Sequence, residues 1–421
     1  MRTKLALLAM AVTAVAGLAP SGAADPFGKA ATLPPTVPAG FAVTLAGLSP
    51  TATSLAFSPD GKSLYVASEL GRVLKYPVVA GKALGKPSMF LSGLSQPLGV
   101  VVTKTAVFVS DSVAQASRTD GIVYRAKDLN GDGKADVFQT VIKGLPNGRH
   151  NTNGMAIGPD GLLYITNGSS SDSGFNGEGG SPEVRPYSGS VLRVDPNATG
   201  LVPAPSMVVA TGFRNIYDIV FVPNGHPAAT PGTVKAVVSM NGPDGQTYGN
   251  ITRPTGEDTL DIFDTASAAV EHFGFPWCLY ERARGGLNGF TQDASQGSCS
   301  PLPTAASDGL PAPVVQAKPS ALFGDHVSAD GIAFNPNTNF PRADDGDLFV
   351  AEFGNFFGTI PAGHKVVRVH FDTAGNVVAV KDFMTGVVPL DLTFAPDGAL
   401  WIADLSGAIL RVANLIPRSI R

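Results

Sequence analysis

One pattern recurs along this chain: an apolar run, a Pro-Asp-Gly or similar turn, and a second apolar run. The clear copies begin at Leu55, Met155 and Leu392, and the weaker copies begin at Leu98, Ile219 and Gly331. β-branched and aromatic residues favour strands, and Asp-Gly tolerates the positive φ that a tight hairpin turn requires. Each copy therefore predicts an antiparallel hairpin, and several copies continue into a third strand.

Hairpins that repeat in this way constrain the fold strongly. A single meander cannot bury both of its faces, whereas meanders stacked radially form a propeller with only short, protected edges. The sequence therefore predicts an all-β, six-bladed β-propeller with long inter-strand loops. The long loops are Ser169 to Pro186 and Asn241 to Pro319, and binding sites are usually built on such loops. A β-sandwich remains an alternative, although it does not explain a turn that recurs in the same place.

The composition agrees with this class of fold. The 421 residues include 49 glycines and 34 prolines, about one residue in five, which argues against long helices. Hydrophobic residues make up 44% of the chain, enough for a large core, and charged residues only 15%. The net charge is −4 and no cluster of Lys and Arg stands out. We therefore expect neither nucleic acid nor an anionic membrane surface as a partner.

The first segment has the features of a secretory signal peptide. Two basic residues precede an apolar run from Leu5 to Leu18, and small residues follow at Gly22 to Ala24. The run of 14 residues is shorter than the roughly 20 that a membrane-spanning helix needs. We expect residues 1–24 to be removed and residues 25–421 to form a single propeller domain without a membrane segment, secreted or periplasmic. An uncleaved anchor is the alternative.

Two cysteines follow the signal segment, Cys278 and Cys299. In an oxidising compartment we expect them to form a disulfide that closes a Gly-rich loop. Two unpaired thiols are the alternative. A zinc site is not expected, because these cysteines lack Cys-x-x-Cys spacing and neighbouring histidines.

Polar residues stand just before two of the predicted strands. His150 lies between glycines ahead of the strand at Met155, where the end of a blade would bring it near the central channel. An imidazole there can take a proton from a substrate hydroxyl. Arg214 and Asn215 precede the strand at Ile219, and a forked cation beside an amide suits carboxylates or quinone carbonyls. A structural histidine, and a surface salt bridge with a turn asparagine, are the alternatives.

Two turns carry oxygen atoms suited to calcium. The first contains Gly242 and Pro243 and offers main-chain carbonyls. The second has the spacing of the first part of an EF-hand loop, with Gln139 where the bidentate glutamate would stand. Its predicted ligands are Asp128, Asn130, Asp132, Lys134 through its main-chain carbonyl, and Asp136. A solvated Asp-rich turn is the alternative, and we expect no catalytic role for this loop.

Several stretches together resemble a known family. They are Val37 to Phe41, His150 placed eight residues before Gly158, Gly212 to Asn215, Gly242-Pro243, Phe273 to Pro276, Ala329 to Phe334 and Gly363 to Val369. In these stretches the chain resembles the quinoprotein glucose/sorbosone dehydrogenases, six-bladed propellers that use pyrroloquinoline quinone (PQQ) and calcium. The resemblance extends over most of the chain beyond the signal segment.

The resemblance implies a role for each of the polar residues before the strands. His150 would be the general base that removes the hydroxyl proton while the sugar carbon gives hydride to the quinone. Arg214 would stabilise the oxyanion that develops on the quinone. Asn215 would help to hold the cofactor.

The resemblance also implies how calcium and the cofactor are bound. The main-chain carbonyls of Gly242 and Pro243 would bind the catalytic calcium, which acts as a Lewis acid on the quinone carbonyl. Lys365 is the first candidate for pairing with a PQQ carboxylate. Arg368 is the second, because strand alternation can turn it outward.

The resemblance thus implies a PQQ- and calcium-dependent oxidoreductase acting on an aldose, a sorbosone-like aldehyde or a related polyol, with the electron acceptor left open. Phe275 replaces a tryptophan of the family pattern, and Val388-Pro389 stands where Arg-Pro is common. With fewer cations, a non-catalytic propeller that binds carbohydrate or protein is the first alternative. A calcium-dependent lactonase is the second, with Asn153, Asn215 and Asp330 as the nearest candidate ligands.

Overall fold

The structure is a computed structural model. It describes residues 34–115, 118–172, 186–248, 251–276, 280–282, 290–292, 310, 313–355 and 362–416. The signal segment, Cys278 and Cys299 lie outside the described residues, so the predicted cleavage and disulfide stay predictions. Within the described ranges, no helix is long and apolar enough to cross a membrane.

In the part of the chain that the structure describes, six sheets are built on four strands each, and they are here called blades 1 to 6 in chain order. Blade 1 contains β2 (Ala52–Phe57), β3 (Ser63–Ser68), β4 (Arg72–Val79) and β6 (Ser88–Ser92), with the short β5 (Ala83–Leu84) beside β4. Blade 2 contains β7 (Gly99–Val102), β8 (Val107–Gln115), β9 (Arg118–Lys127) and β10 (Val137–Pro146). Blade 3 contains β11 (Thr152–Ile157), β12 (Leu163–Asn167), β13 (Ser190–Val194) and β14 (Val208–Thr211).

The second half of the chain forms the other three blades. Blade 4 contains β15 (Asn215–Phe221), β16 (Lys235–Asn241), β19 (Glu257–Asp264) and β24 (Ala321–Asp325). Blade 5 contains β25 (Ala329–Phe334), β26 (Leu348–Glu352), β27 (Lys365–Phe371) and β28 (Val377–Thr385). Blade 6 contains β29 (Pro389–Phe394), β30 (Leu400–Asp404), β31 (Ala408–Asn414) and the N-terminal β1 (Phe41–Leu48).

The remaining elements are additions to this frame. Blade 3 is a mixed sheet, because β20 (Val270–His272) and β23 (Val314–Gln316) extend it in parallel beyond β14. Two hairpins stand apart, β17 (Asp244–Tyr248) with β18 (Ile251–Thr255), and β21 (Tyr280–Arg282) with β22 (Phe290–Gln292). Two 3₁₀ turns, η4 (Pro205–Met207) and η7 (Arg342–Asp344), precede strands.

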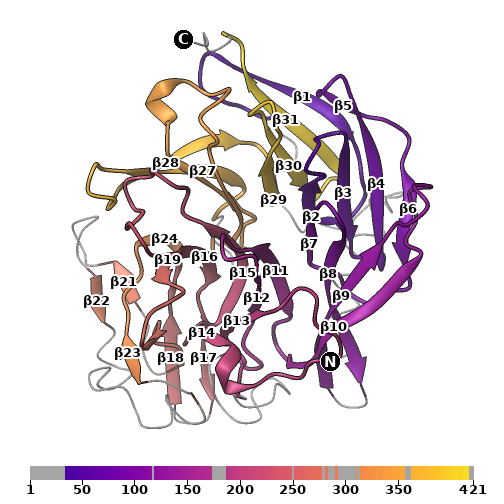
Figure 1. The fold of residues 1–421 in the computed structure, drawn as a ribbon. Coiled ribbons are helices and arrows are strands. Elements are labelled where there is room, and N and C mark those ends of the chain that lie inside the picture. The colour runs from indigo at the N-terminus through magenta and orange to yellow at the C-terminus, as the bar shows by residue number, and fades with distance from the viewer. Residues whose placement is uncertain are drawn as a thin grey trace, which may run out of the picture.

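The first strands of the blades form a closed ring. β2 contacts β7, β7 contacts β11, and the contacts continue through β15, β25 and β29 back to β2. The ring is locked where β1 from the start of the chain pairs with β31 from its end, with Phe41 opposite Asn414 (Figure 1). The prediction of an all-β propeller is confirmed, and the sandwich alternative is excluded by the ring.

The predicted turns link the first and second strands of their blades. Gly61, Gly161 and Gly398 all have positive φ, of 69°, 80° and 76°. Glycine adopts this conformation without the steric cost that a Cβ imposes. The Asp-Gly turns therefore set the same hairpin in blades 1, 3 and 6.

The hydrophobic core lies mainly between blades. Trp401 of β30 is fully buried in a cluster with Leu55 and Val66 of blade 1. Its ring meets the ring of Phe57 edge-on, with the centroids 5.3 Å apart. Burial of one such side chain contributes about 1.5–3 kcal/mol, so each interface between blades stabilises the ring.

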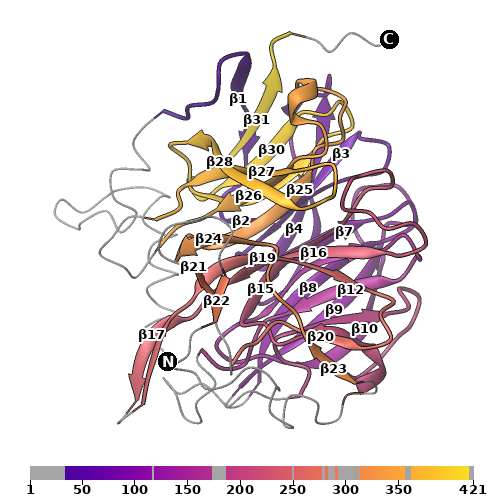
Figure 2. The same cartoon turned by 90° about the vertical axis from the view of Figure 1, so that its left-hand side faces the viewer.

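One end of the propeller carries the candidate site and is called the site end. The strand pairing places there the starts of β11, β15 and β25, the ends of β12, β16 and β26, and the start of β27. Figure 2 shows β15, β16 and β19 beside one another, with the β17 hairpin extending away from them.

Candidate functional site

Three chain segments meet at the site end between blades 3 and 4. Backbone hydrogen bonds join His150, before β11, to Ser169, after β12, and join Ser169 to Arg214, before β15. Gly168 permits this meeting, because a Cβ there would lie 2.6 Å from the Cβ of His150 and 2.9 Å from Oδ1 of Asn215. The structure therefore brings the predicted residues His150, Arg214 and Asn215 together.

The imidazole of His150 is held in one tautomer. Its Nδ1 lies 2.9 Å from the carbonyl oxygen of Ser169. A carbonyl only accepts, so Nδ1 carries the proton and Nε2 keeps its lone pair. Removal from solvent, followed by the charge of Arg214, lowers the pKa of His150 to about 3. The ring is therefore neutral at physiological pH and able to accept a proton at Nε2.

Arg214 is a buried cation with a buried partner. It is 4% exposed, and Asp172 is 3% exposed. Nε of Arg214 donates to the main-chain oxygen of Asp172 at 3.1 Å and to its Oδ1 at 3.0 Å, and Nη2 donates to the same Oδ1. Arg149 contributes a second guanidinium, with its Nε 3.9 Å from Oδ1 of Asp172. A fixed positive charge thus stands beside His150.

Asn215 belongs to a chain of side-chain amides that crosses blades 3, 4 and 5. Nδ2 of Asn153 donates to Oδ1 of Asn215 at 2.9 Å. Nδ2 of Asn215 donates to Oδ1 of Asn241 at 2.7 Å, and Nδ2 of Asn241 donates to Oδ1 of Asp330 at 3.2 Å. The three residues considered for a lactonase-type calcium site are thus joined through Asn241. However, Oδ1 of Asn215, the oxygen that would bind calcium, accepts a hydrogen bond from the side-chain amide of Asn153.

Gly242 and Pro243 form the base of the hairpin that follows β16. The amide of Gly242 donates to Oδ1 of Asp258 at 2.8 Å, and the carbonyl of Pro243 accepts the N–H of Gly256 at 3.0 Å. A Cβ on Gly242 would lie 2.1 Å from the carbonyl oxygen of Gly256. Only glycine permits this close approach, which fixes the position of the two predicted calcium-binding carbonyls.

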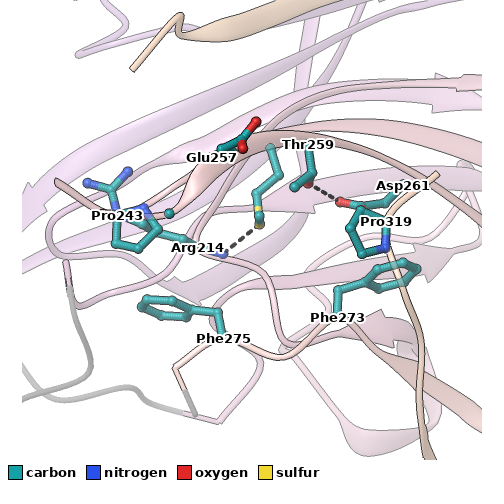
Figure 3. Close-up of a pocket in the computed structure, with 10 residues that line it drawn as sticks. Arg214, Pro243, Glu257, Thr259, Asp261, Phe273, Phe275 and Pro319 are labelled. Carbon is teal, nitrogen blue, oxygen red and sulfur yellow. Dashed lines mark hydrogen bonds between the residues drawn. The ribbon is translucent and has the colours of Figure 1, made fainter. Parts of the chain in front are cut away.

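A cavity lies beside this hairpin base. Glu257, Thr259 and Asp261 alternate along β19 and line one side of it, and Phe273 and Phe275 line the other (Figure 3). The other lining residues are Arg214, Met240, Pro243, Gly256 and Pro319. The cavity measures about 10 Å³, which is room for about one water molecule. Residues of the predicted calcium turn and the predicted arginine therefore line one cavity.

Asp261 is the carboxylate enclosed most fully in this cavity. It is 1% exposed, and its Oδ2 accepts the hydroxyl of Thr259 at 2.7 Å. Its Oδ1 has no hydrogen-bond partner among the described residues. Burial raises the pKa of Asp261 to about 7. Within the described part of the chain, no group of three or more His, Cys, Asp and Glu side chains is arranged to hold a metal ion.

Lys365 lies at the site end, two strands out from the amide chain. It stands opposite Glu352, which stands opposite Ala329. Its Nζ lies 2.7 Å from Oδ1 of Asp382 and 3.7 Å from Oε2 of Glu352. Burial raises the pKa of Glu352 to about 8. The predicted PQQ-pairing lysine thus already has two carboxyl neighbours.

Arg368 is not brought to the site. It lies three residues further along β27, and its guanidinium pairs with Asp344 and, at 3.2 Å through Nε, with Asp347. Both aspartates precede β26, at the opposite end of blade 5 from Lys365. Arg368 therefore belongs to an ion-pair group away from His150.

The predicted EF-hand-like loop lies between β9 and β10 of blade 2. Oδ1 and Oδ2 of Asp128 accept the N–H groups of Gly131 and Gly133 at 2.7 and 2.9 Å. Oδ2 of Asp136 accepts the N–H of Leu129 at 2.7 Å, and Lys75 lies 3.5 Å from Asp128. The carboxylates of Asp128 and Asp136 thus hydrogen-bond to backbone N–H groups of their own turn. Calcium binding by this loop stays a prediction, with Asp128, Asn130, Asp132, Lys134 and Asp136 as the predicted ligands.

Three residues of the site were not found from the sequence. Asp172 lies 42 positions before Arg214, and its only signal was its place in the Gly- and Ser-rich loop after β12. Asn241 directly precedes Gly242 and shares its turn, but nothing in the sequence singled it out. Asp261 lies on a strand with period-two alternation of Glu, Thr and Asp, which a search for inward-facing polar residues would find.

The similarity of this chain to known proteins lies mainly in its fold. Residues 82–215 match a family described as a domain of unknown function, DUF7133. No curated protein matches the chain in sequence. Many solved structures match nearly the whole chain, among them the three that follow.

Two of these structures come from fungi, and their titles name a pyranose dehydrogenase and a carbohydrate-active enzyme. The holo PQQ domain of pyranose dehydrogenase from Coprinopsis cinerea is 15% identical over 90% of this chain and 97% of that chain, with a TM-score of 0.66. The calcium structure of a family AA12 carbohydrate-active enzyme from Trichoderma reesei is 17% identical over 90% and 97%, with a TM-score of 0.68.

A bacterial enzyme matches similarly. The apo form of the soluble aldose sugar dehydrogenase from Escherichia coli is 17% identical over 89% of this chain and 99% of that chain, with a TM-score of 0.59. Identities this low carry the fold rather than the activity. Over about nine-tenths of its length, this chain has the propeller fold found in PQQ-dependent pyranose dehydrogenase and in aldose sugar dehydrogenase.

Proposed function

We propose that this protein is a PQQ- and calcium-dependent oxidoreductase that oxidises an aldose, a sorbosone-like aldehyde or a related polyol. The observation that carries the proposal is the neutral imidazole of His150 beside the buried guanidinium of Arg214. A base with a free lone pair and a fixed cation within one site is what the removal of a hydroxyl proton and of two electrons requires. The likeness in fold supports the same class of reaction.

The residues at the site end have side chains and carbonyls of the kinds that bind calcium and PQQ. Calcium prefers hard oxygen ligands. Pro243 and Asp261 line one cavity, and Oδ1 of Asp261 lacks a partner among the described residues. PQQ carries carboxylates, and Lys365 is the cation that would hold one of them, with Asn215 as an amide donor. When bound, PQQ supplies an electron-accepting quinone, and calcium polarises its carbonyl.

The chain's own residues have separate tasks in this proposal. Nε2 of His150 accepts the substrate's hydroxyl proton, while the carbonyl of Ser169 keeps the opposite nitrogen protonated. Arg214 stabilises negative charge that develops nearby, an effect typically worth about 3 kcal/mol. Asp172 holds the guanidinium in place through hydrogen bonds to Nε and Nη2. The aromatic rings of Phe273 and Phe275 exclude water from one side of the cavity.

The setting of the protein is also part of the proposal. We propose that residues 1–24 direct export and are removed, that residues 25–421 act as one propeller domain in the periplasm or outside the cell, and that Cys278 and Cys299 pair there. Mass spectrometry of the exported protein, with and without reduction, measures the cleavage point and the disulfide. An N-terminus at Met1 or two free thiols would contradict these points.

The test begins with cofactor binding. The mature protein is mixed with PQQ and calcium, followed by absorbance, and then assayed with a redox dye across neutral sugars. Bound quinone and sugar-dependent dye reduction are expected. Absence of both would overturn the proposal. Hydrolysis of a lactone with calcium and without PQQ would instead indicate the lactonase, and carbohydrate binding without turnover would indicate the non-catalytic propeller.

A matched pair of variants then tests His150. His150→Gln removes the base at Nε2 and should lose most of the turnover, about 100-fold or more, while PQQ still binds. His226→Gln is the control, because His226 contacts Gly346 in blade 5 instead of the site. An unchanged rate in His150→Gln would remove His150 from the proposal.

A further inference from the structure

Apart from its main-chain N–H, every polar group of Asn241 makes a hydrogen bond to a neighbouring residue. Its main-chain oxygen accepts Nη1 of Arg214 at 3.3 Å. Its side-chain Oδ1 accepts Nδ2 of Asn215 at 2.7 Å. Its Nδ2 donates to the carbonyl of Ala329 at 3.0 Å and to Oδ1 of Asp330 at 3.2 Å. The residue is therefore a junction between two site residues of blade 4 and the first strand of blade 5.

The position of Asn241 in the sheet links it to several parts of the site. It is the last residue of β16, stands opposite Asn215 in the sheet, and is 9% exposed. The next residues, Gly242 and Pro243, form the turn whose carbonyls are the predicted calcium ligands. Any movement of Asn241 therefore moves the acceptor of Arg214, the acceptor of Asn215 and the start of that turn together.

Only an amide can make this set of contacts. It accepts at oxygen and donates at nitrogen, and here the two ends face opposite partners. Aspartate would still accept from Asn215, but it would direct an oxygen at the carbonyl of Ala329 and the carboxyl of Asp330. Leucine has a similar shape and would leave buried donors and acceptors unpaired, which costs about 1–3 kcal/mol each.

The hydrogen bonds of the amide chain run in one direction. Asn153 donates to Asn215, Asn215 to Asn241, and Asn241 to Asp330, which is 2% exposed. Because each amide has one accepting and one donating end, the carboxyl at the end of the chain fixes the orientation of every amide before it. Asp330 of blade 5 therefore sets the orientation of the Asn215 side chain, whose Oδ1 lies across Gly168 from His150.

We propose that Asn241 is a positioning residue that holds Arg214 and Asn215 in their working orientation by anchoring both to Ala329 and Asp330 of blade 5. Its effect on turnover rests on the proposed dehydrogenase function, whereas its effect on Arg214 does not. Asn241 itself need not touch substrate or cofactor.

The experiment compares Asn241→Asp and Asn241→Leu with a matched control. Asn335→Leu removes another buried asparagine, which is 2% exposed where Asn241 is 9% exposed. The Nδ2 of Asn335 donates to the carbonyl of Asp344 at 2.6 Å. That contact ties blade 5 at the end away from the site. The control therefore reproduces the loss of a buried structural amide without disturbing Arg214.

The first readout needs no cofactor. The Nε–H signal of Arg214 in ¹H–¹⁵N NMR spectra, assigned by its loss in Arg214→Lys, should shift and broaden in both Asn241 variants and stay unchanged in Asn335→Leu. If the signal is unchanged in the Asn241 variants, the positioning role is overturned, whatever their stability. This outcome is independent of whether the protein binds PQQ.

The second readout uses the protein loaded with PQQ and calcium. The turnover number should fall on the order of 100-fold in both Asn241 variants, with KM for the sugar changed less than about twofold. Asn335→Leu should keep both values. Wild-type turnover in Asn241→Asp would overturn the role in the reaction. Failure of the wild type to bind PQQ would overturn the proposed function and leave the NMR result to decide the role of Asn241.

Discussion

Nδ1 of His150 donates a hydrogen bond of 2.9 Å to the carbonyl oxygen of Ser169. This side-chain contact, between the segments on either side of the β11–β12 hairpin, decides the chemistry of the ring. The proton is fixed on the nitrogen that faces the protein backbone, and the lone pair of Nε2 is left for a substrate. The neutral state is reinforced by the loss of solvent and by the charge of Arg214.

The pH profile of the reaction should reflect this arrangement. Because the pKa of His150 is lowered to about 3, the ring stays neutral from about pH 5 upwards and needs no deprotonation before it accepts a proton. We expect kcat/KM for a neutral sugar to show no acid limb from this histidine between pH 5 and 8. An acid limb with its midpoint near 6.5 that disappears in His150→Gln would contradict the pKa.

The ion pair of Arg214 and Asp172 should matter for stability far more than an exposed pair. Both side chains are at most 5% exposed, so Asp172→Asn removes a buried negative charge that pairs with a buried guanidinium, at a cost of about 3–5 kcal/mol. Urea unfolding measures this loss. Asp382→Asn is the control, because Asp382 is 59% exposed in its pair with Lys365 and such pairs contribute about 0–1 kcal/mol. Equal losses in the two variants would refute the argument.

Much of the fold could be predicted from the sequence because its signals are local. Alternating apolar residues and an Asp-Gly turn specify a hairpin within about a dozen residues, and Gly61, Gly161 and Gly398 adopt the positive φ that the turn requires. The pairing of β1 with β31, which closes the ring, could not be predicted from these local signals, because it joins segments far apart in the sequence. The parallel additions β20 and β23 could not be predicted, because three-residue strands carry almost no periodicity of their own.

The site could be predicted only in part. His150, Arg214 and Asn215 stand beside strand starts, and strands of neighbouring blades bring such positions together. Asp172 could not be found, because its partner is 42 residues away and no sequence pattern links the two positions. Arg368 shows that a cation near the right place in the sequence need not reach the site, since its guanidinium pairs with Asp344 and Asp347 at the far end of the blade.

The glycine at position 242 should resist even the smallest side chain. A Cβ there would lie 2.1 Å from the carbonyl oxygen of Gly256, so Gly242→Ala forces apart the two sides of the hairpin base, at about 1–3 kcal/mol. Gly85→Ala is the control, because the nearest atoms to its Cβ would be 3.5 Å away. We expect urea unfolding to show the loss only in Gly242→Ala. Calcium binding, measured by calorimetry in the presence of PQQ, should weaken in the same variant.

The buried carboxyl of Asp261 should make the protein less stable as the pH rises. Burial raises its pKa to about 7, from the 3.8 that is usual for an aspartic acid. A raised folded-state pKa contributes stability fully below the unfolded value and loses it as pH rises through the folded value, by up to about 1.4 kcal/mol per pH unit. Asp261→Asn removes this titration. The free energy of unfolding of the variant, relative to wild type, should therefore increase between pH 4 and 7 and level off above pH 7. Asp382→Asn, which changes an exposed carboxylate, should show no comparable increase over this range. A difference between Asp261→Asn and wild type that stays constant with pH would show that Asp261 ionises normally in the folded protein.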